Sequence, residues 1–167
     1  MVTMKGGMRV ETRQLGLDDI DAAAAVHRTA FDAALPWLAG RYTPAQDRWF
    51  YRERMFAECR MWGAFDGLRM IAVIAFRTGW IDQLYVLPDA QGTGVGTSLV
   101  HIAQGAFDLL RLWTYQRNAH ARRFYQRRGF VLAETTDGAR NEEKEPDALY
   151  RWDRAARIRA TVLTRDS

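Results

Sequence analysis

Residues 91–97 form a glycine-rich segment with the composition of a phosphate-binding loop. The segment follows an apolar stretch, residues 80–87, that ends at Pro88. Glycine allows backbone N–H groups to approach an anion closely, and the N-terminus of a following helix adds a partial positive charge. A phosphate-bearing ligand is therefore expected beside Gln91, Gly92, Thr93, Gly94, Val95, Gly96 and Thr97.

Three glycine-rich patterns compete for this segment. A nucleotide-binding P-loop requires Gly-Lys-Ser/Thr, but no lysine follows Gly94 or Gly96. The dinucleotide fingerprint requires a third glycine where Thr97 stands, and the acidic ribose ligand expected about 20 residues later is absent. The remaining pattern is Gln-x-x-Gly-x-Gly, which Gln91, Gly94 and Gly96 satisfy.

This last pattern resembles the pyrophosphate loop of the Gcn5-related N-acetyltransferases (GNAT), which bind acetyl-coenzyme A. A second segment, residues 118–130, resembles the family's other signature: an asparagine after a strand, a helix containing Phe-Tyr, and Gly-Phe before the next strand. Both motifs occur in the family's order and at its separation. The resemblance extends over about residues 8–153.

The resemblance implies further contacts with the cofactor. The backbone of Leu84, Tyr85 and Val86 would bond the pantetheine arm, and one N–H there would polarise the thioester carbonyl. Asn118 stands where the family's asparagine bonds the same arm, although it could instead cap a helix. Arg122 could reach a cofactor phosphate or remain a solvated arginine.

Two residues are candidates for proton transfer. Tyr125 is expected to be the general acid, because a phenol with a pKa near ~10 suits a departing thiolate near ~8.5. The alternative is an aromatic side chain packed in the core. The resemblance places the base, or a residue that orders a proton-carrying water, at the positions of Trp80 and Asp82, and of these two only Asp82 can titrate. Its pKa is expected to be raised if it faces an apolar cleft. An ion pair or a turn ligand is its alternative, and the rivals are Glu58, Glu142, Glu143 or water alone.

The acceptor side, by resemblance, would come from the first two helices and the acidic loop 142–145. Aromatic residues gather in those helices, and beside acidic groups they could receive an organic cation. Core packing explains the same aromatic residues equally well. They are Phe31, Trp37, Tyr42, Trp49 and Tyr51.

Hydrophobic periodicity predicts an α/β (α+β) chain with a mixed central sheet of about seven strands and about four flanking helices. The order of these elements resembles that of the GNAT fold. Residues 1–7 are expected to be a disordered start, 8–154 a single N-acetyltransferase domain, and 155–167 a C-terminal tail. The expected strands are 9–15, 61–65, 70–76, 80–87, 110–114, 130–133 and 148–152, and the expected helices are 18–36, 43–56, 97–107 and 119–128.

Composition restricts the remaining possibilities. The net charge of +4 comes from dispersed arginines without a recognition motif, so nucleic acid is not an expected partner. A single cysteine, Cys59, suits a reducing cytoplasm, and no apolar run predicts a membrane span. The histidines lack the spacing of metal ligands, so no metal is expected. A homodimer through the closing strand 148–152 is possible.

Together these features predict an acyltransferase that moves an acetyl group from acetyl-CoA to a primary amine of a small molecule or peptide. Transfer is expected to be direct, within a ternary complex. The alternative is a non-catalytic, acyl-CoA-binding regulatory module with the same fold.

Overall fold

The computed structural model describes residues 2–3 and 9–163. The chain divides into two compact units. The first comprises Met1–Arg77 and Ile81–Ile102, and the second comprises Thr78–Trp80 and Ala103–Ser167. The boundary passes through a strand and a helix, β5 (Trp80–Val86) and α4 (Val95–Ala106).

The sheet of the first unit begins with antiparallel strands in the order β1-β2-β3-β4, beside which β5 lies. Their bounds are β1 (Val2–Thr3), β2 (Arg9–Gln14), β3 (Arg60–Asp66) and β4 (Arg69–Arg77). Strand β4 supplies most of the core, because Met70 to Phe76 are all buried. Gly67, at φ +60°, lies in the tight turn that joins β3 to β4.

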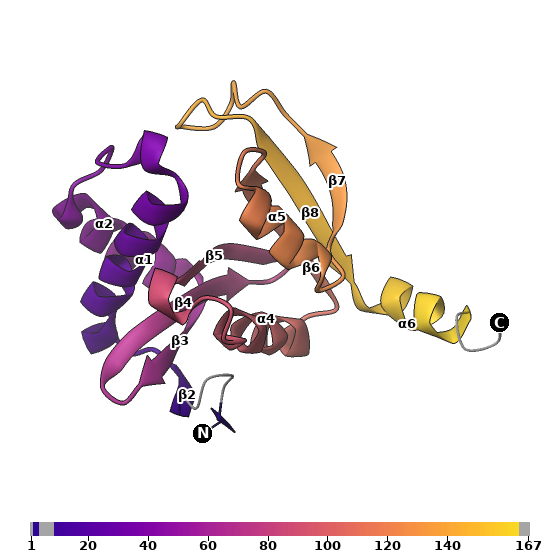
Figure 1. The fold of residues 1–167 in the computed structure, drawn as a ribbon, viewed down its shortest axis with the longest axis horizontal. Helices are drawn as coiled ribbons and strands as arrows, with labels where there is room; N and C mark the ends of the chain where they lie inside the picture. Colours follow the sequence, from indigo (N-terminus) through magenta and orange to yellow (C-terminus); the bar gives the residue numbers. More distant parts are fainter. Residues whose placement is uncertain (1, 4–8, 164–167) are drawn as a thin grey trace. The chain divides into compact units, whose positions relative to one another are not determined.

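Helix α1 (Ile20–Ala34) packs on β4 and on α2 (Pro44–Phe50), as Figure 1 shows. The α2 start is confirmed, since Thr43 Oγ1 accepts from Gln46 N at 3.2 Å and Pro44 occupies the first helical position. Asp19 is the N-cap residue of α1, but its side chain makes no capping hydrogen bond to this helix. Asp19 instead accepts from the Gly16 N–H at 2.9 Å, within the short turn η1 (Leu17–Asp19).

The predicted helix 43–56 does not continue regularly. After α2 the backbone forms a turn of π-helix, η3 (Tyr51–Met55), before the short α3 (Phe56–Glu58). Turns of this kind are rare and occur frequently at functional sites. Another short turn, η2 (Pro36–Leu38), ends the α1 segment.

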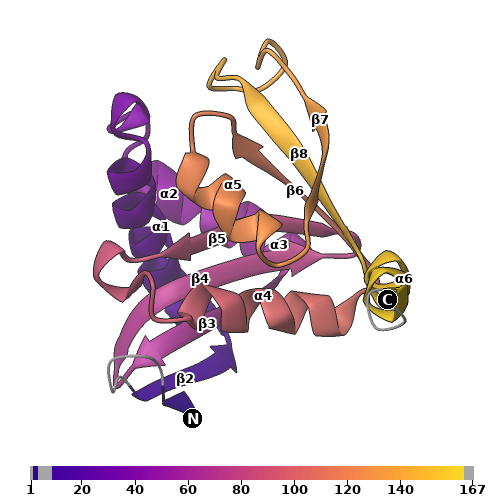
Figure 2. The same ribbon diagram turned by 45° about the vertical axis from the view of Figure 1, so that its right-hand side comes forward.

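The second unit is built on the strand order β6-β8-β7, with antiparallel neighbours. Helix α5 contacts β7, and Figure 2 shows it alongside these strands. Trp80, at the start of β5, pairs in parallel with Arg111 of β6. The bounds are β6 (Leu109–Tyr115), α5 (Ala119–Gln126), β7 (Val131–Thr135), β8 (Asp147–Asp153) and α6 (Arg154–Leu163).

Parallel and antiparallel pairs occur together, so the predicted mixed α/β fold is confirmed. The tail expected from residue 155 forms α6, and residues 164–167 lie outside the described part. Residues 4–8, most of the expected loose start, lie outside it as well. Nowhere in the described residues is a helix both long and apolar enough to span a bilayer.

Candidate functional site

The glycine-rich loop joins the end of β5 to the start of α4. Gly92 and Gly94 have φ values of +76° and +102°, a conformation that side chains disfavour. Helix α4 begins at Val95, two residues earlier than the predicted Thr97. The first N–H groups of a helix have no acceptor within it, so this end of α4 can donate to an anion.

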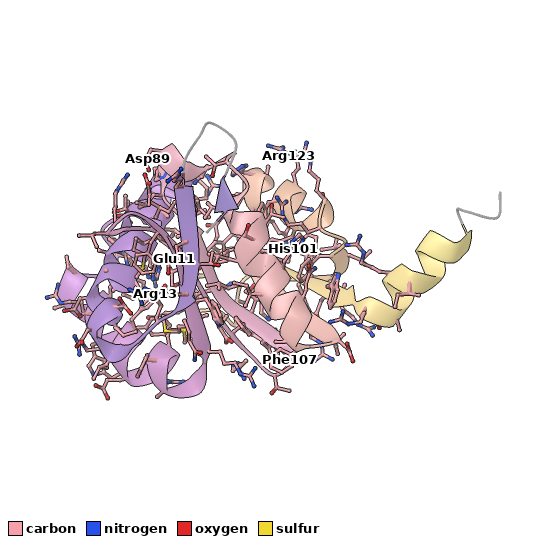
Figure 3. All side chains as sticks on the ribbon, turned by 90° about the horizontal axis from the view of Figure 1, so that it is seen from below. Glu11, Arg13, Asp89, His101, Phe107 and Arg123 are labelled. Carbon is pink, nitrogen blue, oxygen red and sulfur yellow. The ribbon has the colours of Figure 1, made fainter. Side chains whose placement is uncertain are left out.

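Side chains of the loop tie it to the strand before it. Gln91 Nε2 donates to the Val86 carbonyl at 3.1 Å, and Thr93 Oγ1 donates to the Ala90 carbonyl at 2.7 Å. The Gln91 hydrogen bond thereby attaches the loop to β5, and the Thr93 bond attaches it to the turn that follows this strand. Asp89 lies in the connecting turn η4 (Pro88–Ala90) at the surface (Figure 3). Its pKa is lowered by Arg69, whose Nη1 donates to it at 2.8 Å.

Asp82 lies on β5 in an environment that differs from the expected apolar cleft. Both of its carboxylate oxygens accept hydrogen bonds from the Arg77 guanidinium, at 3.1–3.2 Å. The Cys59 thiol also donates to Oδ2 at 3.6 Å. The ion pair that was the alternative for Asp82 is therefore present. Burial, followed by the Asp82 charge, raises the pKa of Cys59 to about 12 and keeps it a thiol.

Leu84, Tyr85 and Val86 are all partly buried on β5. The Tyr85 ring stacks on the His27 imidazole of α1, with ring centroids 4.3 Å apart and planes 13° apart. His27 is only 8% exposed, and burial lowers its pKa to about 4. Sequence reasoning missed this histidine. A signal was available, because His27 lies on the same helical face as the apolar Ala23, Ala24 and Phe31.

The buried His27 gives a testable pH dependence of stability. An unfolded histidine titrates near ~6.5, so between pH 4 and 6.5 the unfolded chain holds a proton that the folded chain lacks. Stability should therefore fall as pH falls through this window, by about 3 kcal/mol in all. Asp47 and Asp32 oppose this shift electrostatically, while Arg28 reinforces it.

His27→Phe keeps an aromatic ring in the stack but removes the titrating group. Urea unfolding of the variant between pH 4 and 6.5 should show a shallower loss of stability than the wild type. Equal slopes in the two proteins would contradict the buried, neutral imidazole.

The residues of the second motif lie in the second unit. Asn118 caps α5, since its Oδ1 accepts from Ala121 N at 3.1 Å, so the capping alternative is present. Arg122 is not simply solvated: its Nε donates to the Tyr150 hydroxyl at 3.0 Å and its Nη1 to the Gln116 carbonyl at 3.2 Å. Arg123 is the exposed neighbour on α5 (Figure 3).

Tyr125 is 8% exposed and lies between two phenylalanine rings. Its centroid is 5.2 Å from that of Phe124 and 5.5 Å from that of Phe130, both in edge-to-face geometry. Its backbone carbonyl accepts from Arg128 N and Phe130 N, which ends α5 and starts the turn into β7. The Tyr125 ring is therefore packed in the core, which was the alternative to its role as the general acid. The two roles are compatible, because packing involves the ring and proton transfer involves the hydroxyl.

The acidic groups of the first two helices are neutralised internally. Arg28 of α1 donates to both Asp47 oxygens, at 2.5 and 2.6 Å, and to Asp32 at 3.0 Å. Its guanidinium also lies over the Phe31 ring at 5.3 Å. Of the expected acceptor-side aromatic residues, Phe31 and Tyr51 are buried, whereas Trp37 and Trp49 are exposed.

The acidic loop of the second unit is also largely engaged. Glu145 is buried and pairs with Arg117 at 3.5 Å, while Lys144 Nζ donates to the Ala139 carbonyl. Within residues 2–3 and 9–163, no group of three or more His, Cys, Asp or Glu residues is placed to hold a metal ion.

A family model described as an acetyltransferase (GNAT) domain matches residues 44–132. No curated protein sequence matches the chain. Solved structures share its fold, and three of them illustrate the likeness.

The apo form of YjaB from Escherichia coli is 20% identical with a TM-score of 0.72, covering 87% of this chain and 98% of its own. A GCN5-related N-acetyltransferase from Rhodopseudomonas palustris is 18% identical with a TM-score of 0.73, covering 87% and 97%. The PaiA N-acetyltransferase of Thermoplasma acidophilum, in complex with coenzyme A, is 21% identical with a TM-score of 0.65, covering 87% and 99%.

Proposed function

Because this chain belongs to the GNAT acetyltransferase family, and is therefore an acyltransferase, we propose that it transfers an acetyl group from acetyl-CoA to a primary amine. The acceptor would be a small molecule or a peptide. The observation that carries the proposal is the loop in which two positive-φ glycines precede the N-terminus of α4. The PaiA relative, which was solved with coenzyme A, supports the same ligand class.

The loop would hold the cofactor pyrophosphate through its backbone N–H groups, with Gln91 keeping the loop attached to β5. The backbone of Leu84, Tyr85 and Val86 would then align the pantetheine arm, and one N–H would polarise the thioester. Such a preorganised donor is worth about 10²–10³ in rate. In the second unit, Asn118 and Arg122 are proposed to contribute further cofactor contacts.

The reaction needs one attack and two proton movements. The amine nitrogen bonds to the thioester carbon, the C–S bond breaks, and the amine loses one proton. Tyr125 is proposed to donate its proton to the departing thiolate and to regain one from solvent afterwards. Asp82, or a water molecule that it orders, is proposed to take the proton from the amine.

Direct transfer is favoured over an acyl-cysteine intermediate. A thioester on the protein would require a thiolate nucleophile. The pKa of Cys59 is raised to about 12, mainly by burial, so this side chain stays protonated at neutral pH. Its hydrogen bond to Asp82 instead makes it part of the surroundings of the proposed base.

Turnover and cofactor binding together test the proposal. The purified chain, supplied with acetyl-CoA and a panel of primary amines, should release free coenzyme A thiol only when an amine is present. Mass spectrometry should show the amine heavier by one acetyl group. Tight binding of acetyl-CoA by calorimetry without thiol release for any amine would favour the non-catalytic binding module. Failure to bind acetyl-CoA would contradict both.

A further inference from the structure

Three aromatic side chains of the first unit meet around His27. We call this group, His27, Phe31, Tyr51 and Tyr85, the His27 cluster. The imidazole stacks on Tyr85, and its centroid lies 5.3 Å from that of Tyr51 and 5.7 Å from that of Phe31. The cluster joins α1, the π-turn η3 and β5, the strand whose backbone is proposed to hold the thioester.

Two polar atoms of the His27 cluster are buried without a hydrogen-bond partner among the described residues: His27 Nδ1 and the Tyr51 hydroxyl. His27 is 8% exposed and Tyr51 is fully buried. Buried polar atoms almost always have a hydrogen-bond partner in folded proteins. Two such atoms without a partner in one cluster therefore require an explanation. Tyr51 also opens the π-turn, a local structure that is frequent at functional sites.

The surroundings of the His27 cluster disfavour a charged group within it. Arg28 engages both neighbouring carboxylates, Asp47 and Asp32. Burial is the main cause that lowers the pKa of His27 to about 4, so its imidazole is neutral at pH 7. The same desolvation disfavours any charged ligand group and would hold a bound amine in its neutral, nucleophilic form.

Building on the acetyl-transfer function proposed above, we propose that His27 Nδ1 and the Tyr51 hydroxyl receive the amino group of the acceptor, and that this acceptor is an amine on an uncharged aromatic or apolar body. A neutral primary amine has two N–H donors and one lone pair. One N–H would donate to Nδ1 of the Nε2–H tautomer, and the other to the Tyr51 oxygen. The lone pair would remain available to attack the thioester carbon.

In this proposal, Tyr85 would control the entry to these atoms. Its side chain is partly buried and stacked directly on the imidazole. The acceptor would turn the ring aside and then lie against it, which favours an aromatic or apolar body over a second ammonium group. A polyamine would bring an additional charge into the desolvated cluster.

Tyr51→Phe tests the proposal because it removes only the unpaired hydroxyl. An unsatisfied buried group destabilises the ligand-free protein, so the melting temperature should stay constant or rise. Calorimetric affinity for 2-phenylethylamine should fall about tenfold, the scale of one lost hydrogen bond, and kcat/KM for that amine should fall equally. Affinity for coenzyme A should not change.

Tyr150→Phe is the matched control for stability. Tyr150 is also fully buried, but its hydroxyl accepts from Arg122 and Gln126 at 3.0 and 3.4 Å. Removing that hydroxyl should lower the melting temperature. An equal fall for Tyr51→Phe would show that the Tyr51 hydroxyl is already paired, and would overturn the proposal.

The remaining outcomes separate this proposal from the proposed function. A wild type that binds putrescine more tightly than 2-phenylethylamine, or a Tyr51→Phe variant that binds 2-phenylethylamine normally, contradicts the acceptor site alone. Binding of 2-phenylethylamine that depends on Tyr51, without acetylation of any amine, supports the site but contradicts the transferase reaction. If 2-phenylethylamine does not bind, the proposed acceptor site is contradicted, whether or not the protein acetylates other amines.

Discussion

Gly94→Glu should abolish the binding of coenzyme A. The substitution places a carboxylate in the loop that is proposed to hold the pyrophosphate. Two unit charges 4 Å apart at an effective dielectric constant of 20 repel by about 4 kcal/mol, which corresponds to roughly a thousandfold loss of affinity. Calorimetry should therefore detect no binding at cofactor concentrations that saturate the wild type.

Backbone strain is the competing explanation, because Gly94 has a φ of +102°. Gly67→Glu provides the matched control: Gly67 is also exposed and at positive φ, but it lies in the turn between β3 and β4. Both variants should lose stability, but only Gly94→Glu should lose coenzyme A. Equal affinity of the two variants for coenzyme A would show that the loop is not part of the cofactor site.

The arrangement around this loop could be predicted from local sequence. The apolar run 80–87, the glycine spacing and the apolar period after it each indicate one element, and β5, the loop and α4 occur in that order. The error lay in the helix start. Val95 and Gly96 already belong to α4. The sharp change of chain direction takes place at Gly94, which has a positive φ, so the helix can begin at the next residue even though Gly96 is a glycine.

Pairings between distant residues could not be predicted in the same way. The apolar residues of segment 43–56 have roughly helical spacing, so their periodicity indicated a continuous helix. The π-turn that begins at Tyr51 is a local departure from this spacing and was not predicted. Arg28 finds Asp47 only after α1 and α2 pack together, so this ion pair could not be predicted from local sequence. The helical face of His27 indicates its burial, but its stacking on Tyr85 depends on tertiary packing.

The environment of Asp82 was partly accessible from the sequence. An ion pair was among the alternatives for Asp82, but its partner was not identified. Arg77 ends β4 and Asp82 follows on β5 after a short turn, which brings the two side chains together. What could not be anticipated is Cys59, which approaches from the end of α3, a segment more than twenty residues earlier. Its thiol contact depends on tertiary packing alone.

Tyr125→Phe should lower kcat by about 10²-fold or more, the usual scale for the loss of a positioned proton donor. The variant retains the ring that packs edge-to-face on Phe124 and Phe130. Affinity for acetyl-CoA and the far-ultraviolet circular dichroism spectrum should therefore remain those of the wild type. Steady-state release of coenzyme A thiol with an established amine substrate measures the effect, and normal turnover would exclude Tyr125 as the acid.

The pH profile separates the acid from the proposed base. A bell-shaped dependence of kcat/KM reports one group that must be protonated and one that must be deprotonated. Tyr125→Phe should remove the alkaline limb, whereas Asp82→Asn should remove the acidic limb if Asp82 accepts the amine proton. Asp82→Asn also breaks the ion pair with Arg77, so a lower melting temperature with an unchanged bell would assign Asp82 a purely structural role.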